Sequence, residues 1–141
     1  MLDVLASAAE RLNSALGLLG TAYDLLDERA GERLESGLFG PVQHAYGRLR
    51  RTYSEFAGRH GLPPREFPPA PEAAPGHGVH ELIEHVIVEA AEADAELGDL
   101  QDTMLPVEVG DRELRDGIAE TRSRIAPVPE AARGLLRTFG R

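Results

Sequence analysis

Apolar residues recur at alternating steps of three and four positions in four segments of this chain, and this spacing strongly constrains its fold. The stripes cover residues 2–30, residues 39–56 with His60 next in phase, residues 79–104 and residues 114–128. A repeat of about 3.5 residues predicts helices that pack at a left-handed angle of roughly 20°. We therefore expect an all-α four-helix bundle.

The composition agrees with a single globular domain over residues 1–141, with 42% hydrophobic and 28% charged residues. A net charge of −9 argues against nucleic acid and anionic membranes as partners. The absence of cysteine excludes disulfides and thiolate chemistry. No basic leader precedes an apolar run, and the uncharged stretch of residues 12–23 is too short for a bilayer, so we expect a soluble, cytoplasmic protein.

Glycine and proline divide the chain into elements. We expect helices at about residues 2–34, 40–60, 79–104 and 108–126, a linker at 61–78 and a short helix at about 130–139. The first turn is placed near residues 36–40, and the stretch before it either continues the first helix or forms a separate short one. Asp111 is a plausible N-cap, and Pro127 and Pro129 should interrupt the last helical segment.

The linker holds six of the ten prolines and should therefore be stiff and extended, at about 3.1 Å per residue. It could cross one end of the bundle, which gives an up-and-down topology. It could instead run along the side, which makes the second and third helices parallel. We favour the up-and-down form. Residues 65–71 also have the basic-plus-two-proline spacing of an SH3 ligand, as an alternative to a plain linker.

Histidines and glutamates gather at the start of the third helix and are candidate metal ligands. At helical spacing, His80 lies beside Glu84, and Glu81 lies beside His85, so a divalent metal could bind at this surface. The same acidic residues would also complement the helix dipole. A di-iron centre is disfavoured, because the stripes hold no carboxylate and no Glu-x-x-His occurs. The candidate metal cluster is His77, His80, Glu81, Glu84 and His85.

His44 is a second candidate, because its position two residues after Val42 places it outside the stripe and exposed. The segment from His44 to Arg48 resembles the site of histidine phosphotransfer domains, which are also four-helix bundles. That resemblance implies a phosphate-accepting role for His44, although Gly47 precedes Arg48 here where the family has the basic residue first. A solvated surface histidine is the alternative.

Charge is distributed unevenly between the helices. Residues 79–104 carry many acids and no arginine, whereas residues 40–60 are rich in arginine. The two helices either neighbour each other within one chain, or they offer faces to a basic partner or a second copy. The candidate interaction residues are Glu89, Glu92, Glu96, Asp99, Arg48 and Arg51.

No catalytic motif accompanies these features, and there is neither a Gly-x-Ser-x-Gly nor a phosphate-binding glycine loop. We expect a non-enzymatic module that binds a protein partner or itself, most simply as a homodimer. A bundle that binds a metal or another small ligand is the alternative, and phosphotransfer through His44 is a second one. No cofactor is predicted apart from the divalent metal that the histidine cluster could hold.

Overall fold

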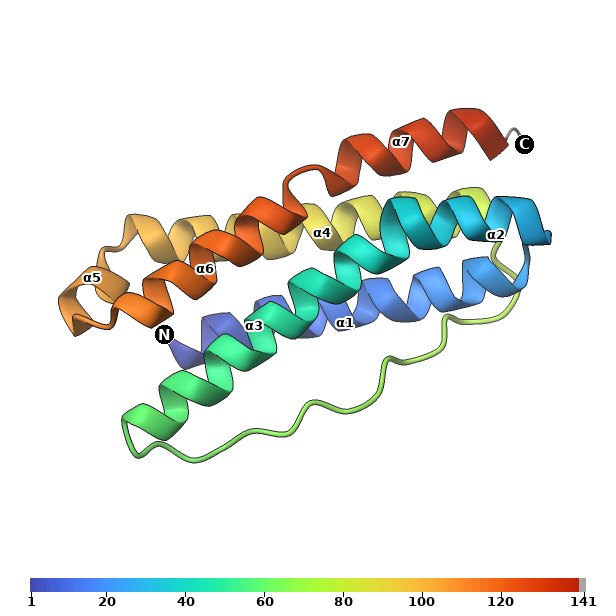
Figure 1. Ribbon diagram of the computed structural model, residues 1–141. Coiled ribbons are helices and arrows are strands. Elements are labelled where there is room, and N and C mark those ends of the chain that lie inside the picture. Colours follow the sequence, from blue (N-terminus) through green and yellow to red (C-terminus); the bar gives the residue numbers. More distant parts are fainter. Residues whose placement is uncertain (140–141) are drawn as a thin grey trace.

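The computed structural model describes residues 1–139, which form helices and no strand (Figure 1). None of the helices in this range is long and apolar enough to cross a membrane. The all-α prediction is therefore confirmed for the described part of the chain. The helical elements are α1 (Leu2–Asp24), α2 (Glu28–Leu34), the π-helical turn η1 (Glu35–Phe39), α3 (Gly40–Arg59), α4 (Val79–Asp102), α5 (Leu105–Val109), α6 (Arg112–Ile125) and α7 (Val128–Phe139).

The predicted stripes form most of the hydrophobic core. The principal helix pairs are α1 with α4 and α3 with α6, joined by contacts of α1 with α3 and of α4 with α7. In the second pair, Gly117 lies directly against the side chain of Thr52, where a Cβ atom would clash. Fully buried stripe residues include Leu5, Leu12, Leu19, Leu49, Ile83, Leu97, Leu114 and Ile118.

The first turn lies earlier than the sequence predicts. A turn near residues 36–40 and a first helix that continues to residue 34 are both wrong, because α1 ends at Asp24 and the turn occupies residues 25–27. The alternative of a separate short helix before residue 36 is confirmed by α2. Asp27 starts α2, and its Oδ1 accepts a hydrogen bond of 2.8 Å from the backbone N–H of Ala30. From Glu28 to Arg59 the chain is helical without a break.

Pro41 and five glycines lie within this continuous segment instead of ending it. Pro41 has no N–H to donate to the preceding turn. In η1, just before it, the hydrogen bonds span five residues instead of four, and the N–H of Gly40 donates to the carbonyl of Glu35. Gly31 lies against the Tyr23 ring, and Gly37 faces Leu135. These two glycines therefore permit close packing and do not mark a turn.

The linker runs along the side of α1, so the favoured up-and-down topology is wrong. Arg65 Nη2 contacts Glu10 Oε1 at 2.5 Å, and the Asn13 amide donates to the Pro68 carbonyl at 3.0 Å. Further along, the N–H of Ala73 donates to Thr21 Oγ1 at 3.3 Å. Contacts in the same order along both segments show that the linker runs parallel to α1. In Figure 1, α3 and α4 accordingly run in the same direction.

Particular side chains fix the linker to the helices. Phe67 packs edge-on against Tyr53 and Tyr46, with ring centroids 5.6 and 6.5 Å away. Gly17 of α1 lies under the Pro71 carbonyl, where a Cβ atom would clash with the backbone. The buried amide of Asn13 is satisfied by its hydrogen bond to the linker. Long-range partners of this kind select the crossover path.

Between α4 and residue 139, the last that the structure describes, the chain contains one more helix than expected. The predicted helix over residues 108–126 is divided between α5 and α6, with Pro106 in the first turn of α5. Asp111 is the N-cap of α6, as predicted, and accepts from the Leu114 N–H at 2.9 Å. The final helix begins at Val128, two residues before the expected start.

Candidate functional site

The acidic residues of α4 are paired mainly within the chain. Arg11 of α1 forms ion pairs with Glu89, Glu92 and Glu96, all on one face of α4. The hydrogen bond with Glu96 raises the pKa of Arg11 above its ordinary value, against the opposing effect of burial. These three predicted interaction residues therefore stabilise the α1–α4 pair.

The second set of charges joins α6 to its neighbours. Arg122 of α6 binds Asp94 of α4 at 2.8 Å and donates to the Gln101 side chain at 2.7 Å. Arg48 of α3 binds Glu120 of α6 at 2.6 Å. The simplest prediction, that the arginine-rich and acidic helices neighbour and neutralise each other, is wrong, because each pairs with a different helix.

Two predicted interaction residues keep no ion pair within residues 1–139: Asp99 on α4 and Arg51 on α3, both exposed. Their role in binding a partner stays a prediction. Arg51 also lines a surface hollow with two other arginines, Arg48 and Arg124.

A polar cluster lies where the end of α3 meets the start of α6. Buried Asp111 accepts hydrogen bonds from Arg59 Nε and Nη2 at 3.0 and 2.8 Å, and its Oδ2 lies 2.8 Å from His60 Nε2. Burial alone would raise the pKa of Asp111, but the bonds from Leu114, His60 and Arg59 outweigh it and lower the pKa to about 2. Asp111 thus carries a stable negative charge that joins the two helices.

The predicted metal cluster is spread over the start of α4. His77 Nδ1 lies 3.0 Å from Glu81 Oε2, and both side chains are largely exposed. Glu84 and His85 are exposed, whereas His80 is half-buried. Across the described range, no three side chains of metal-ligating type lie close enough together to hold an ion.

His44 lies on the surface of α3, as its position relative to Val42 predicts. It lines a surface hollow of about 430 Å³ between α3 and α6, together with Arg48, Arg51 and Arg124. Gln43, Gly47 and Glu120 complete this hollow. A phosphate-accepting role for His44 stays a prediction, but the structure surrounds this histidine with cationic side chains.

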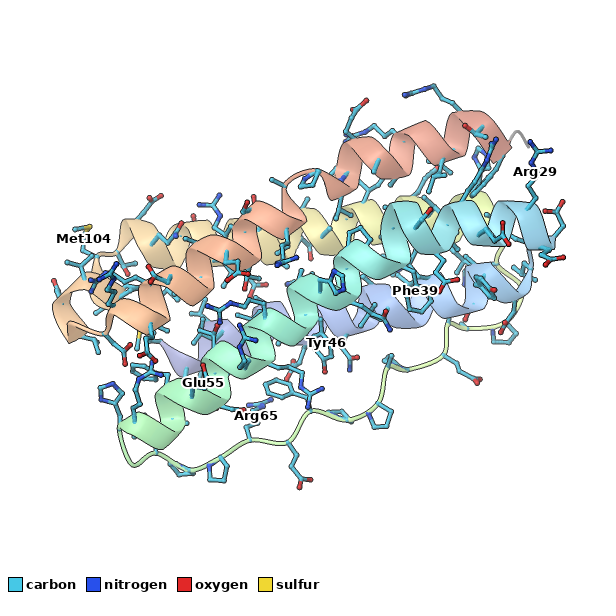
Figure 2. All side chains as sticks on the ribbon, viewed as in Figure 1. Arg29, Phe39, Tyr46, Glu55, Arg65 and Met104 are labelled. Atoms are coloured by element: carbon cyan, nitrogen blue, oxygen red, sulfur yellow. The ribbon has the colours of Figure 1, made fainter. Side chains whose placement is uncertain are left out.

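The α5 tip is a feature that the sequence patterns did not identify. We define it as Met104, Leu105, Val107 and Val109, whose exposed fractions are 52, 41, 50 and 42%. The stripe pattern assigned Met104 to the core, but the helix ends at Asp102 and Met104 turns outward with a φ of 67°. Figure 2 shows Met104 at the α5 end of the molecule and Arg29 at the opposite end.

A signal for the tip was present in the sequence. Leu105, Val107 and Val109 lie around a proline just after the third stripe and belong to none of the four stripes. An apolar segment between two helices that cannot join either one is a candidate for exposure. Comparison with protein families, curated proteins and solved structures finds no match for this chain.

Proposed function

We propose that this chain is a non-enzymatic cytoplasmic interaction module that forms a homodimer through the α5 tip. The observation that supports this proposal is the grouping of four half-exposed large apolar side chains within six residues. Isolated exposed apolar residues are ordinary, whereas a contiguous group is typical of a binding surface. Burying such a side chain contributes up to about 1.5–3 kcal/mol.

The backbone keeps these side chains outward. The Met104 carbonyl accepts from the N–H groups of Val107 and Glu108 at 3.0 and 2.9 Å, which closes the turn of α5. Pro106, between the exposed residues, is itself buried and anchors the tip to the molecule. A left-handed backbone at a methionine costs about 1–2 kcal/mol. A strained and anchored segment supports a role in recognition better than a role in stability.

A second copy is the partner that the surrounding charges favour. The chain carries a net charge of −9, so two copies should repel each other over most of their surface, and a contact between copies needs a region of mixed charge. Charges of both signs occur in and after the tip: Glu108 is exposed, and so is Arg112 four residues further along the chain, whose one ion pair in the described chain is a 3.8 Å contact with Asp116. Two tips related by a two-fold axis could place Glu108 of each copy near Arg112 of the other.

The proposed scaffold is a four-helix bundle within one domain. Its four helical components would be α1, the segment from α2 to α3, α4, and the segment from α6 to α7. This scaffold leaves the tip at one end, where a contact between two copies would be small. Small interfaces are typical of transient complexes, so we expect a dimer with a dissociation constant of about micromolar or weaker.

Sedimentation velocity of the full chain over a wide concentration range tests the proposal. The native chain should shift from monomer to dimer as its concentration rises. The double variant Leu105→Ser with Val107→Ser should stay monomeric with an unchanged circular dichroism spectrum. Val88→Ser is the matched control, because Val88 is also half-exposed but lies in the middle of α4. Loss of dimer in the control, or a native chain that is monomeric throughout, would contradict the proposal.

A further inference from the structure

The hollow between α3 and α6 gathers positive charge on an acidic protein. His44, Gly47, Arg48 and Arg51 follow one face of α3, at helical steps of three and four residues. Arg124 approaches from α6, and Glu120 is the single acid in the lining. Like charges at this spacing destabilise a helix by a few tenths of a kcal/mol per pair. Their grouping therefore points to a bound anion.

Glu120 orients two of the guanidinium groups. Its Oε2 accepts from Arg48 Nε at 2.6 Å, and its Oε1 accepts from Arg124 Nη2 at 3.1 Å. The Arg48 Nη1 group also donates to Thr52 Oγ1 at 2.9 Å, which leaves its Nη2 group for a ligand. The Arg48 side chain is 14% exposed, against 42% for Glu120 and 44% for Arg124. The guanidinium groups are thus held in place before a ligand arrives.

Arg51 is not held by any carboxylate. In residues 1–139 neither Arg51 nor His44 has an ion pair or a hydrogen bond from its side chain. Three arginines against one glutamate leave the lining with a net charge of +2. A phosphomonoester at neutral pH carries a charge of about −1.5 to −2. Guanidinium groups bind such oxyanions in a planar, two-pronged geometry.

We propose that this hollow binds the phosphoryl group of a small molecule. Arg51 and Arg48 would contact the phosphoryl oxygens, and Arg124 would complete the positive side. Glu120 is a positioning residue that orders Arg48 and Arg124. The site is independent of the α5 tip, so either proposal can fail alone.

Titration of the full chain with inorganic phosphate, followed by two-dimensional amide NMR, tests the site. We expect saturable shifts confined to residues around 43–51 and 120–124. Sodium chloride at equal ionic strength should not reproduce them. Acetate tests whether a carboxylate binds equally well, and we expect it to bind at least about tenfold more weakly than phosphate. Equal binding of acetate would overturn the assignment to a phosphoryl group, and no saturable shift with phosphate would overturn the site.

Two variants separate binding from folding. Arg51→Gln should weaken phosphate binding by about tenfold or more, whereas Arg29→Gln, an equal charge change in α2 outside the lining of the hollow, should leave it unchanged. Gly47→Gln places a side chain in the hollow, where a Cβ at this position meets no atom within 4 Å. This variant should raise helix stability and still abolish binding. Equal weakening by both arginine variants, or full binding by Gly47→Gln, would overturn the proposal.

Discussion

The α1–α4 pair and the α5 tip are opposite in how they use charge and apolar surface. In the pair, Leu12 and Leu97 are fully buried, and Arg11 forms ion pairs with three glutamates of α4. At the tip, four apolar side chains are half-exposed. The densest charge in the sequence is therefore paired largely within the chain, whereas the surface that we propose for a partner lies where the heptad pattern ends.

The largest expected difference between the two regions is in stability. Leu97→Ala removes a fully buried side chain and should lower the free energy of unfolding by about 2–5 kcal/mol. Leu105→Ala at the tip should change it by no more than about 0.5 kcal/mol. Urea unfolding of both variants, at concentrations where the protein is monomeric, measures the contrast. Similar losses would mean that the tip is part of the core.

The polar cluster around Asp111 should show an intermediate effect. Asp111→Ala removes the N-cap of α6 and the partner of Arg59, so we expect a loss of about 1–2 kcal/mol in urea unfolding. Asp111→Asn keeps the cap but removes the charge, and should lose less. If the two variants lose equal stability, the charge and not the cap is the stabilising feature.

The lowered pKa of Asp111 gives this cluster a defined pH dependence. Its folded-state pKa of about 2 lies below the ordinary 3.8, so its charge contributes stability that is fully present above about pH 4. That contribution is lost as the pH falls through 2. The stability difference between the native chain and Asp111→Asn should therefore shrink between pH 4 and pH 2. A difference that stays constant over this range would show that the charge does not contribute.

Within the α1–α4 pair, the surface charges should contribute much less than the buried leucines. Arg11→Gln leaves Glu89, Glu92 and Glu96 without their cation and should cost at most about 1 kcal/mol at low salt. Added salt should reduce this cost, because the Arg11 side chain is 36% exposed. Thermal melts at low and high salt measure it, with Arg29→Gln as control. A large, salt-independent loss would assign Arg11 a packing role.

The sequence predicts the buried stripes well, because residues three and four positions apart lie on one face of a helix and the apolar face is the one that packs inward. Leu5, Ile83 and Ile118 follow directly from the spacing. The first turn was missed because Tyr23 and Leu26 continue the stripe in phase across it. Gly37 and Gly40 favour a turn in the sequence, although both lie within a continuous helix, in which Gly37 faces Leu135.

Long-range partners could not be predicted in the same way. The linker path depends on Asn13 and Gly17, whose partners Pro68 and Pro71 lie more than fifty residues away. The charge signs of α3 and α4 are visible in the sequence, but the helix that each one faces is not. His44 was identified as an exposed histidine, whereas Arg124, which shares its hollow, comes from α6 and was missed.

A single introduced cysteine tests the central claim about the tip most directly, because the native chain has none. Val107 and Val88 are matched, with exposed fractions of 50 and 48%. Under mild oxidation, Val107→Cys should form a disulfide-linked dimer, since two tips in contact bring these residues within bridging distance. Val88→Cys should stay monomeric on a non-reducing gel. Equal cross-linking of both variants, or none for Val107→Cys, would contradict self-association through the tip.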